Sequence, residues 1–479
     1  MADATISLGI TGSRDDNGIK AALLCSDGEI IVEKYGSLYL PYSNDLKTKI
    51  STAKIEMFKL YNHSNGPPYN KAKLLSRLVV HPSKKKLIDE LSMEITQWCV
   101  QVAKRILQRT DKKADIIGFN GHPLLLKEGT KDSAPMAYNL GLPSILAEET
   151  KAITVFDFHD ADIELGGRGV PLVPIFYNSL FRYAACRGFI EEKQTVAIVS
   201  LDEMANVTVL NSFGAIESFC AGPGNVLVKE YVQRVFQRSN DSLGILANKG
   251  DIIEKIVNMW IEDKILPLKV HNKIKIQQAN IERKTRSKKP KKKKATKSGW
   301  ETYWLNKFDV SAENCQNAEG DEAWQKEDLT FRDFLDCLEL ASRVLTPVDC
   351  VATLSAFTAQ AVSFVLNKRY GNLIRTIVLT GSERKNVFIK TALSKSYNVV
   401  VSDDISWDEN FMEAEQYALY AVRSLFMFPT TFPSTTGVSK PALAGKLTIP
   451  ISFCNGQKSN TAKQHHERER RSAWVAAKK

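Results

Sequence analysis

Short hydrophobic runs separated by polar segments recur at two places along the chain, and both patterns predict paired β-strands. In residues 5–35, two apolar runs flank the polar segment 11–18, and a third run follows Asp27-Gly28. Asp-Gly between apolar runs is a hairpin signal. A second unit of the same design begins near Thr195, where apolar runs flank residues 201–206. The repetition predicts a duplicated architecture with two related lobes.

Apolar residues at helical spacing lie between and after these units and predict helices. Residues 348–371 are apolar enough for a buried helix, and residues 373–381 have the pattern of a buried strand ending on a glycine. Strands that alternate with helices favour an α/β fold, with a ligand cleft between the lobes. The other predicted helices cover residues 84–109, 225–238, 329–345 and 408–428.

A chain of 479 residues is too long for one core. We predict an N-terminal lobe over residues 1–190 and a C-terminal lobe over 191–455, with a lysine-rich insertion at about 268–298. Residues 456–479 form a basic tail, which we expect to be mobile.

The net charge of +11 comes from two short basic segments rather than from the whole chain. Arg283–Lys294 carries nine positive charges and no negative one, and residues 463–479 add +4, which leaves about −2 for the rest. A nearly neutral body argues against a protein built throughout to bind nucleic acid. The run at Arg283–Lys294 fits either a solvated insertion, which we favour, or a contact with nucleic acid or an import receptor that would bring the protein into the nucleus.

No apolar run approaches the ~18 residues of a membrane span. The N-terminus lacks the basic and apolar regions of a signal peptide. The eight cysteines are scattered, mostly in apolar contexts typical of small buried side chains. We therefore expect a cytoplasmic protein without membrane contact.

One stretch carries most of the candidate chemistry. The segment DFHDADIELGGRGVPLVP, residues 157–174, follows the pattern D-F-R-x-x-D-x-x-x-G-G-Q-G-A-P-L-V-P of the anhydro-N-acetylmuramic acid kinases. Further matches appear in family order at AGPGN (221–225), DCVATLSAFTA (349–359), GSERKN (381–386), MEAEQYALYAVRSL (412–425) and FPSTTG (432–437). The chain thus resembles this family, which lies in the superfamily of sugar kinases, Hsp70-like ATPases and actin.

The resemblance implies a two-lobed actin-like ATPase (ribonuclease H-like) fold with a duplicated strand–loop–strand core. It also implies a kinase that uses ATP and Mg²⁺ on an anhydro amino sugar. Water would open the 1,6-anhydro ring at the anomeric carbon, and the 6-oxygen would take the γ-phosphoryl group. The small sugar is the expected partner, and a homodimer is left open.

The resemblance also assigns site residues. Asp162 stands where the family has its general base, with a turn-capping aspartate as the alternative. We expect the neighbouring Asp160 to be a solvated turn residue. Asp15 and Asp16 are candidate Mg²⁺ ligands. The implied ATP-binding residues are Gly12, Ser13, Arg14, Asp15, Asp16, Asn17, Gly18, Gly222, Pro223, Gly224, Asn225, Gly381 and Asn386. The implied substrate-binding residues are Asp157, Gly166, Gly167, Arg168, Asn120, Glu413 and Thr436.

Several positions depart from the family pattern. His159 and Arg168 replace an arginine and a glutamine, and Asp202 and Glu203 replace two glycines of the second loop. Carboxylates aimed at a triphosphate would repel it by several kcal/mol at low dielectric unless a metal intervenes. Lys20, Cys220 and Lys229 stand where the family has acidic residues, which also argues against binding of a metal and a triphosphate. The second hypothesis is therefore a catalytically degenerate member, a pseudokinase that binds a ligand or partner.

Overall fold

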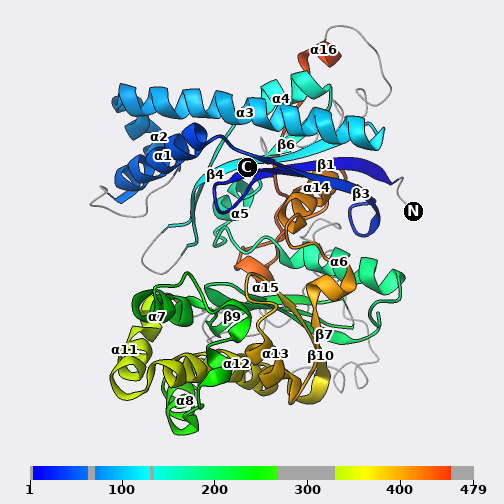
Figure 1. Ribbon diagram of the computed structural model, residues 1–479. Coiled ribbons are helices and arrows are strands. Elements are labelled where there is room, and N and C mark those ends of the chain that lie inside the picture. Colours follow the sequence, from blue (N-terminus) through cyan, green and yellow to red (C-terminus); the bar gives the residue numbers. More distant parts are fainter. Residues whose placement is uncertain (1–3, 63–70, 130–133, 213, 268–328, 455–479) are drawn as a thin grey trace, which may run out of the picture.

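The computed structural model describes residues 4–62, 71–129, 134–212, 214–267 and 329–454. Two lobes lie one above the other, each built around a β-sheet with helices against it (Figure 1). The predicted insertion at 268–298, the basic run Arg283–Lys294 and the tail 456–479 lie outside the described residues.

The first sheet has the strand order β12-β6-β4-β1-β2-β3, with β5 paired to β4. Its strands β1, β2 and β3 form an antiparallel meander, and β4 and β6 run parallel to β1 on the other side. The strands are β1 (Thr5–Gly12), β2 (Gly18–Ser26), β3 (Ile31–Pro41), β4 (Ile116–Lys127), β5 (Met136–Leu140), β6 (Ile153–Phe156) and β12 (Lys446–Thr448).

The second sheet repeats this arrangement in the order β11-β10-β7-β8-β9. Strands β7, β8 and β9 form the antiparallel meander, and β10 and β11 run parallel to β7. The repeated order confirms the predicted duplicated α/β core of an actin-like ATPase fold. The strands are β7 (Thr195–Leu201), β8 (Met204–Leu210), β9 (Ile216–Pro223), β10 (Ile374–Thr380) and β11 (Asn398–Val401).

Helices cover both sheets (Figure 1). In the first lobe they are α1 (Asn44–Asn62), α2 (Lys71–Val80), α3 (Pro82–Thr110), α4 (Pro143–Thr150), α5 (Asp160–Glu164) and α6 (Pro174–Cys186). The later helices are α7 (Val226–Phe236), α8 (Glu254–Trp260), α11 (Leu335–Val344), α12 (Pro347–Tyr370), α13 (Val387–Ser394), α14 (Met412–Leu425), α15 (Pro433–Thr436) and α16 (Ile451–Cys454).

Helix α14 lies against the first sheet although it comes late in the chain. A Cβ atom at Gly9 of β1 would lie 1.8 Å from the carbonyl oxygen of Ala414, and one at Gly118 of β4 would lie 1.9 Å from that of Tyr417. These two glycines let the helix backbone approach the strands. Strand β12 also pairs with β6 of this sheet. Segments from the end of the chain therefore pack on the sheet formed by its beginning. The lobe limits 1–190 and 191–455 stay a prediction.

The central helix of the second lobe is α12, as its apolar sequence predicts. The expectation that no apolar stretch approaches a membrane span is corrected here: within the described residues, one helical stretch, Pro347–Leu373, is long and apolar enough to cross a membrane. However, 72% of its most apolar window is buried inside the protein. Such burial is typical of a core helix, here packed among the strands and helices of the second lobe.

Candidate active site between the lobes

The loop between β1 and β2 is braced by Ser13. The Ser13 hydroxyl oxygen accepts hydrogen bonds from the backbone N–H groups of Asn17 (3.1 Å) and Gly18 (3.0 Å). Gly12 lies against His122 of β4, since a Cβ at Gly12 would be 2.2 Å from the imidazole Nδ1. Residues 12–18 therefore form one tight loop. Local hydrogen bonds join most of the implied ATP-binding residues within it.

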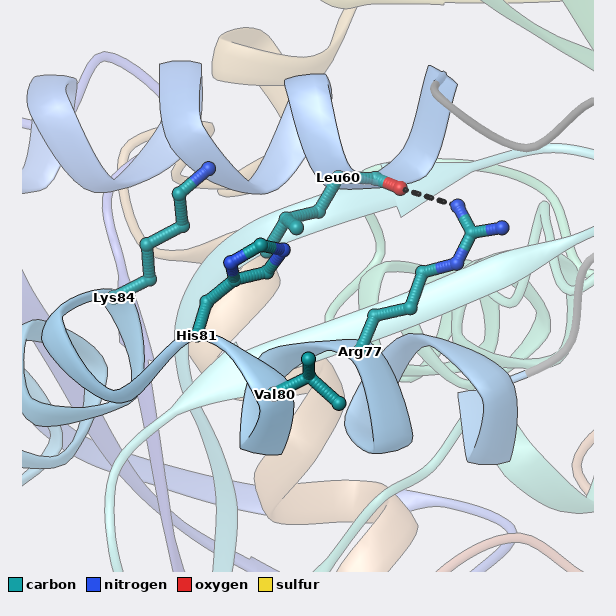
Figure 2. Close-up of a pocket in the computed structure, with 5 residues that line it drawn as sticks. All are labelled: Leu60, Arg77, Val80, His81 and Lys84. Atoms are coloured by element: carbon teal, nitrogen blue, oxygen red, sulfur yellow. Dashed lines mark hydrogen bonds between the residues drawn. The ribbon is translucent and has the colours of Figure 1, made fainter.

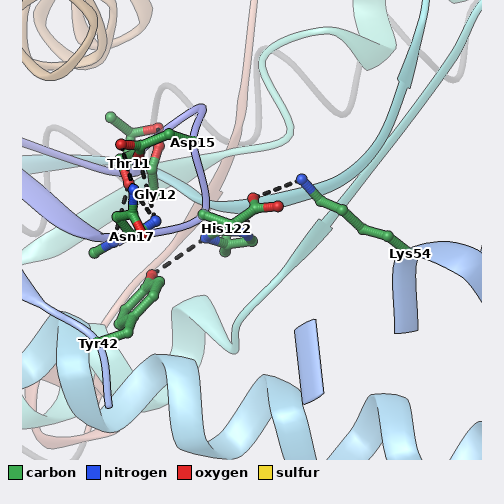
Figure 3. A network of polar contacts seen from close by, with 10 residues as sticks. Thr11, Gly12, Asp15, Asn17, Tyr42, Lys54 and His122 are labelled. Carbon is green, nitrogen blue, oxygen red and sulfur yellow. Dashed lines mark hydrogen bonds and ion pairs between the residues drawn. The ribbon is translucent and has the colours of Figure 1, made fainter. Parts of the chain in front are cut away.

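The two candidate metal ligands of this loop have separate partners. Asp16 Oδ1 lies 2.6 Å from Lys54 Nζ and 2.9 Å from His122 Nε2. Asp15 accepts a 2.6 Å hydrogen bond from the Asn17 side chain. Figure 3 shows Lys54 and Tyr42 approaching this network from different sides.

His122 uses both ring nitrogens here, because the Tyr42 hydroxyl lies 3.2 Å from its Nδ1. Burial opposes ionisation of Asp16, but hydrogen bonds from His122 and Lys54 outweigh it and lower the Asp16 pKa. Among the described residues, no three His, Cys, Asp or Glu side chains gather as metal ligands would. Magnesium binding by Asp15 and Asp16 stays a prediction, and these contacts do not favour it.

Arg14 has its ionic partner outside this network. Its side chain is 77% exposed, and its Nε lies 3.5 Å from Glu413 Oε2 in the first turn of α14. The charge of Glu413 raises the pKa of Arg14, and the charge of Asp202 in the second lobe acts in the same direction. Arg14 is thus a cation placed between acidic groups of the two lobes.

The predicted base, Asp162, is held by two segments that are distant in sequence. Its Oδ1 accepts a hydrogen bond from the Gly169 N–H (2.8 Å), and its Oδ2 accepts one from the Thr436 hydroxyl (2.5 Å). The residue is 1% exposed. A Cβ at Gly167 would lie 2.2 Å from Asp162 Oδ1, so the turn leaves no room for a side chain there. The structure thus brings Asp162, Gly167 and Thr436 together.

His159 holds the same turn from its other side. Its Nδ1 lies 2.8 Å from the Gly169 carbonyl oxygen, which can only accept, so Nδ1 carries the proton. Burial lowers the pKa of His159, which keeps the ring neutral at pH 7. The family cation is therefore replaced by a neutral ring that fixes the peptide next to Asp162.

The interpretation of Asp160 as a solvated turn residue is wrong. Asp160 is 8% exposed, and its carboxylate lies 3.0 Å from Lys71 Nζ and 2.6 Å from Lys446 Nζ. Burial opposes its ionisation, yet hydrogen bonds and charge from Lys446 and Lys71 lower its pKa. Asp157 joins the cluster at 3.2 Å from Lys446 Nζ. Lysines 89 and 286 residues away give Asp160 its partners, which a local pattern does not reveal.

Two further implied substrate residues also have protein partners. The Arg168 guanidinium lies 3.0 Å from Glu128. Asn120 is buried and donates to the Thr11 hydroxyl (3.2 Å), while its carbonyl accepts from Asn139 (3.0 Å). Gly166 has a positive φ of 80° and open space beside it. The sugar-binding roles of these residues stay predictions.

In the second lobe, the loop between β7 and β8 is organised around Asp202. Its carboxylate accepts hydrogen bonds from the Ser200 hydroxyl (2.8 Å) and the Ser382 backbone N–H (3.0 Å). The backbone N–H of Asn225 donates to the Asp202 carbonyl (2.7 Å). Gly381, with φ of 86°, lies against this hairpin, because a Cβ there would be 2.9 Å from Leu201 N. The implied nucleotide loops at 222–225 and 381–386 thus meet the acidic hairpin.

Glu383 is a functional candidate that sequence reasoning missed. It is 5% exposed, and the side-chain amides of Asn225, Asn240 and Asn386 all donate to its carboxylate. A local pattern gives no signal for this cluster, because Asn225 and Asn240 are 158 and 143 residues away from Glu383 in the chain. Asn386 also caps α13, because its side-chain oxygen accepts from the Ile389 N–H.

A pocket of about 430 Å³ lies elsewhere, on the helical side of the first lobe. Figure 2 shows Arg77 donating to the carbonyl oxygen of Leu60, with His81 and Lys84 nearby. No implied site residue lines this pocket. The candidate active site is instead the group of charged residues that act on one another. The charges of Glu413 and Asp202 act on Arg14, and those of Asp162 and Glu413 act on His159.

Two lobes that repeat one strand order, an antiparallel meander followed by parallel strands, are typical of the actin-like ATPases, which include sugar kinases. A family model, "Anhydro-N-acetylmuramic acid kinase", matches residues 45–269 and 325–450. The chain therefore belongs to the anhydro-N-acetylmuramic acid kinase family, as the sequence motifs predicted, and the match leaves out residues 270–324 around the lysine-rich run.

Curated relatives agree along nearly the whole chain. The anhydro-N-acetylmuramic acid kinase of Pelagibacter ubique (strain HTCC1062) is 26% identical over 458 residues, covering 92% of this chain and 97% of that protein. That of Methylobacterium nodulans is 25% identical, covering 93% and 100%. Among solved structures, a ROK hexokinase from Thermus thermophilus aligns at 10% identity and a TM-score of 0.31, covering 86% of this chain and 97% of that one. At this TM-score the alignment carries no weight, so the strand order above defines the fold.

Proposed function

We propose that the protein is an ATP-dependent kinase that acts on a 1,6-anhydro amino sugar, with Asp162 as the general base. The fixed Asp162 carboxylate supports this proposal. Two hydrogen bonds, from Gly169 and Thr436, orient it and still leave acceptor capacity on its oxygens for a water molecule. A positioned carboxylate of this kind contributes ~10²–10⁴-fold to a reaction in which water is the nucleophile.

In the proposed reaction, water attacks the anomeric carbon and gives its proton to Asp162. The bond between that carbon and the bridging 6-oxygen breaks, and the 6-oxygen forms a bond to the γ-phosphorus of ATP, so that ADP leaves. Arg14 and the loop 12–18 would contact the phosphates from the first lobe. Mg²⁺, when bound, would neutralise phosphate charge.

The test is incubation of the purified protein with ATP, Mg²⁺ and anhydro-N-acetylmuramic acid, followed by mass spectrometry of the sugar product. We expect a 6-phosphorylated, hydrated sugar, and a loss of about 10²-fold or more in kcat for Asp162→Asn. Asp89→Asn, on an exposed face of α3, is the matched control and should keep full activity. Unchanged turnover in Asp162→Asn would exclude the proposed base.

A second candidate function is that of a degenerate family member that binds a ligand without phosphoryl transfer. Its support is Asp202, whose carboxylate engages the Ser382 N–H at 3.0 Å beside Gly381. Backbone N–H groups near glycines are the groups that cradle phosphates in such loops. Thermal-shift titration with ATP, with and without Mg²⁺, separates the two functions when it is read together with the product assay. Stabilisation by ATP together with sugar phosphate formation supports the kinase, and absence of product, with or without stabilisation, supports the degenerate member.

A further inference from the structure

The ion pair between Arg14 and Glu413 joins the two halves of the candidate site. Arg14 lies in the loop implied to bind nucleotide, and Glu413, 23% exposed, belongs to the residues implied to bind the sugar. Their charged atoms are 3.5 Å apart, without a hydrogen bond that would lock the pair. Because Arg14 is 77% exposed, its side chain has room to move to another anion.

The surroundings explain why Arg14 has this partner. The family pattern places an arginine at the position of His159, whose neutral ring is tied to the Gly169 carbonyl. Glu413 acts electrostatically on both His159 and Arg14. The guanidinium that faces Glu413 is that of Arg14 in the β1–β2 loop, whereas the neutral His159 ring is tied to Gly169.

A nucleotide would change this balance. A phosphate offers Arg14 several charged oxygens and bidentate geometry, which a single carboxylate oxygen at 3.5 Å does not provide. We propose that nucleotide phosphate takes Arg14 from Glu413 and thereby frees the Glu413 carboxylate to accept hydrogen bonds from sugar hydroxyls. This inference rests on the proposed kinase function and adds a coupling between its two ligands.

The coupling is reciprocal, because each ligand must raise the affinity for the other by the same factor. Exposed ion pairs contribute little free energy. Because the coupling arises from breaking this pair, we expect each ligand to raise the affinity for the other by about 1.5- to 5-fold. Nucleotide binding is thus expected to strengthen sugar binding by that factor, and sugar to strengthen nucleotide binding equally.

The test is calorimetric titration of anhydro-N-acetylmuramic acid into the full chain, with and without a saturating non-hydrolysable ATP analogue. In the wild type we expect the analogue to tighten sugar binding by about 1.5- to 5-fold. In Arg14→Ala, Glu413 is already free, so sugar affinity without nucleotide should equal that of the nucleotide-bound wild type, and the coupling should vanish. Lys104→Ala, which removes a positive charge paired with Glu149 on the outer helices, should keep the wild-type coupling.

A second variant gives an effect of opposite sign. Glu413→Gln should weaken sugar binding but tighten binding of the analogue by the same 1.5- to 5-fold, since Arg14 is no longer held. A purely structural pair would not shift the two affinities in opposite directions. If wild type binds both ligands independently, or Arg14→Ala retains the coupling, this inference is wrong while the kinase proposal stands. If wild type binds neither ligand, the kinase proposal fails, and the inference fails with it.

Discussion

The β1–β2 loop and the β7–β8 loop occupy matching places in the duplicated lobes, but their charges are arranged differently. In the first loop, Asp16 contacts Lys54 and His122, and the exposed Arg14 pairs with Glu413 of α14. In the second loop, the Asp202 carboxylate itself binds the Ser382 N–H. The first loop thus presents the Arg14 cation to a nucleotide, whereas the second presents the Asp202 carboxylate, which the Ser382 N–H already binds. Duplication preserved the strand order while the loop chemistry diverged.

The largest expected effect tests how rigid the second loop is. Gly224→Ala would place a Cβ 2.2 Å from the backbone oxygen of Asp202, which cannot rotate away. We expect a loss of about 3 kcal/mol in the free energy of unfolding. Gly12→Ala meets the His122 side chain instead and should cost less, about 2 kcal/mol. Urea unfolding of both variants measures the difference, and an equal or reversed ranking would contradict it.

The next effect concerns nucleotide affinity. Asp202→Gly restores the family residue and releases the Ser382 N–H from the carboxylate. We expect ATP to bind about 10-fold more tightly, from one recovered charge-assisted hydrogen bond and lost repulsion. Glu230→Gln on α7, which pairs with Arg234 at the surface, is the charge-matched control. Unchanged affinity in Asp202→Gly would show that Asp202 does not compete with phosphate.

The smallest effect is the pH dependence of the first loop. The contacts of Asp16 with His122 and Lys54 lower its folded pKa below the unfolded value of ~3.9. Its stabilisation is therefore present above about pH 4 and is lost as pH falls through the folded pKa. Asp16→Asn should lower the free energy of unfolding by about 1 kcal/mol at pH 6, and the gap to wild type should close below pH 4. A gap that stays constant from pH 6 to pH 3 would contradict this assignment.

The fold was predictable because the hydrophobic patterns that specify its elements are local and occur twice along the chain. Two strand–loop–strand patterns and the helical spacing of residues 84–109 and 348–371 correspond to β1–β3, β7–β9, α3 and α12. The packing of α14 on the first sheet was not predictable in this way. It depends on Gly9 and Gly118, two isolated glycines whose common partner becomes visible only in three dimensions.

The candidate site was predictable only in part. Motif order placed Asp162 and Thr436 among the implied site residues, and the structure joins their side chains across 274 residues. Local patterns assigned Asp160 to solvent, because its lysine partners are far away in the chain. They also gave no sign that Glu383 would gather three asparagine amides. Long-range partners decide the chemistry of an acidic side chain, and a single sequence does not state them.

The position of α14 also has a consequence for synthesis of the chain. Strands β1 to β4 are complete at Lys127, but the helix that covers Gly9 and Gly118 spans Met412–Leu425. At ~5–20 residues per second, a ribosome needs on the order of tens of seconds to add the intervening residues. During that time one face of the first sheet lacks its native cover, and an exposed apolar face is prone to aggregate. A fragment ending near residue 190 would keep that face open permanently, so chaperone binding during translation should concentrate on the first lobe.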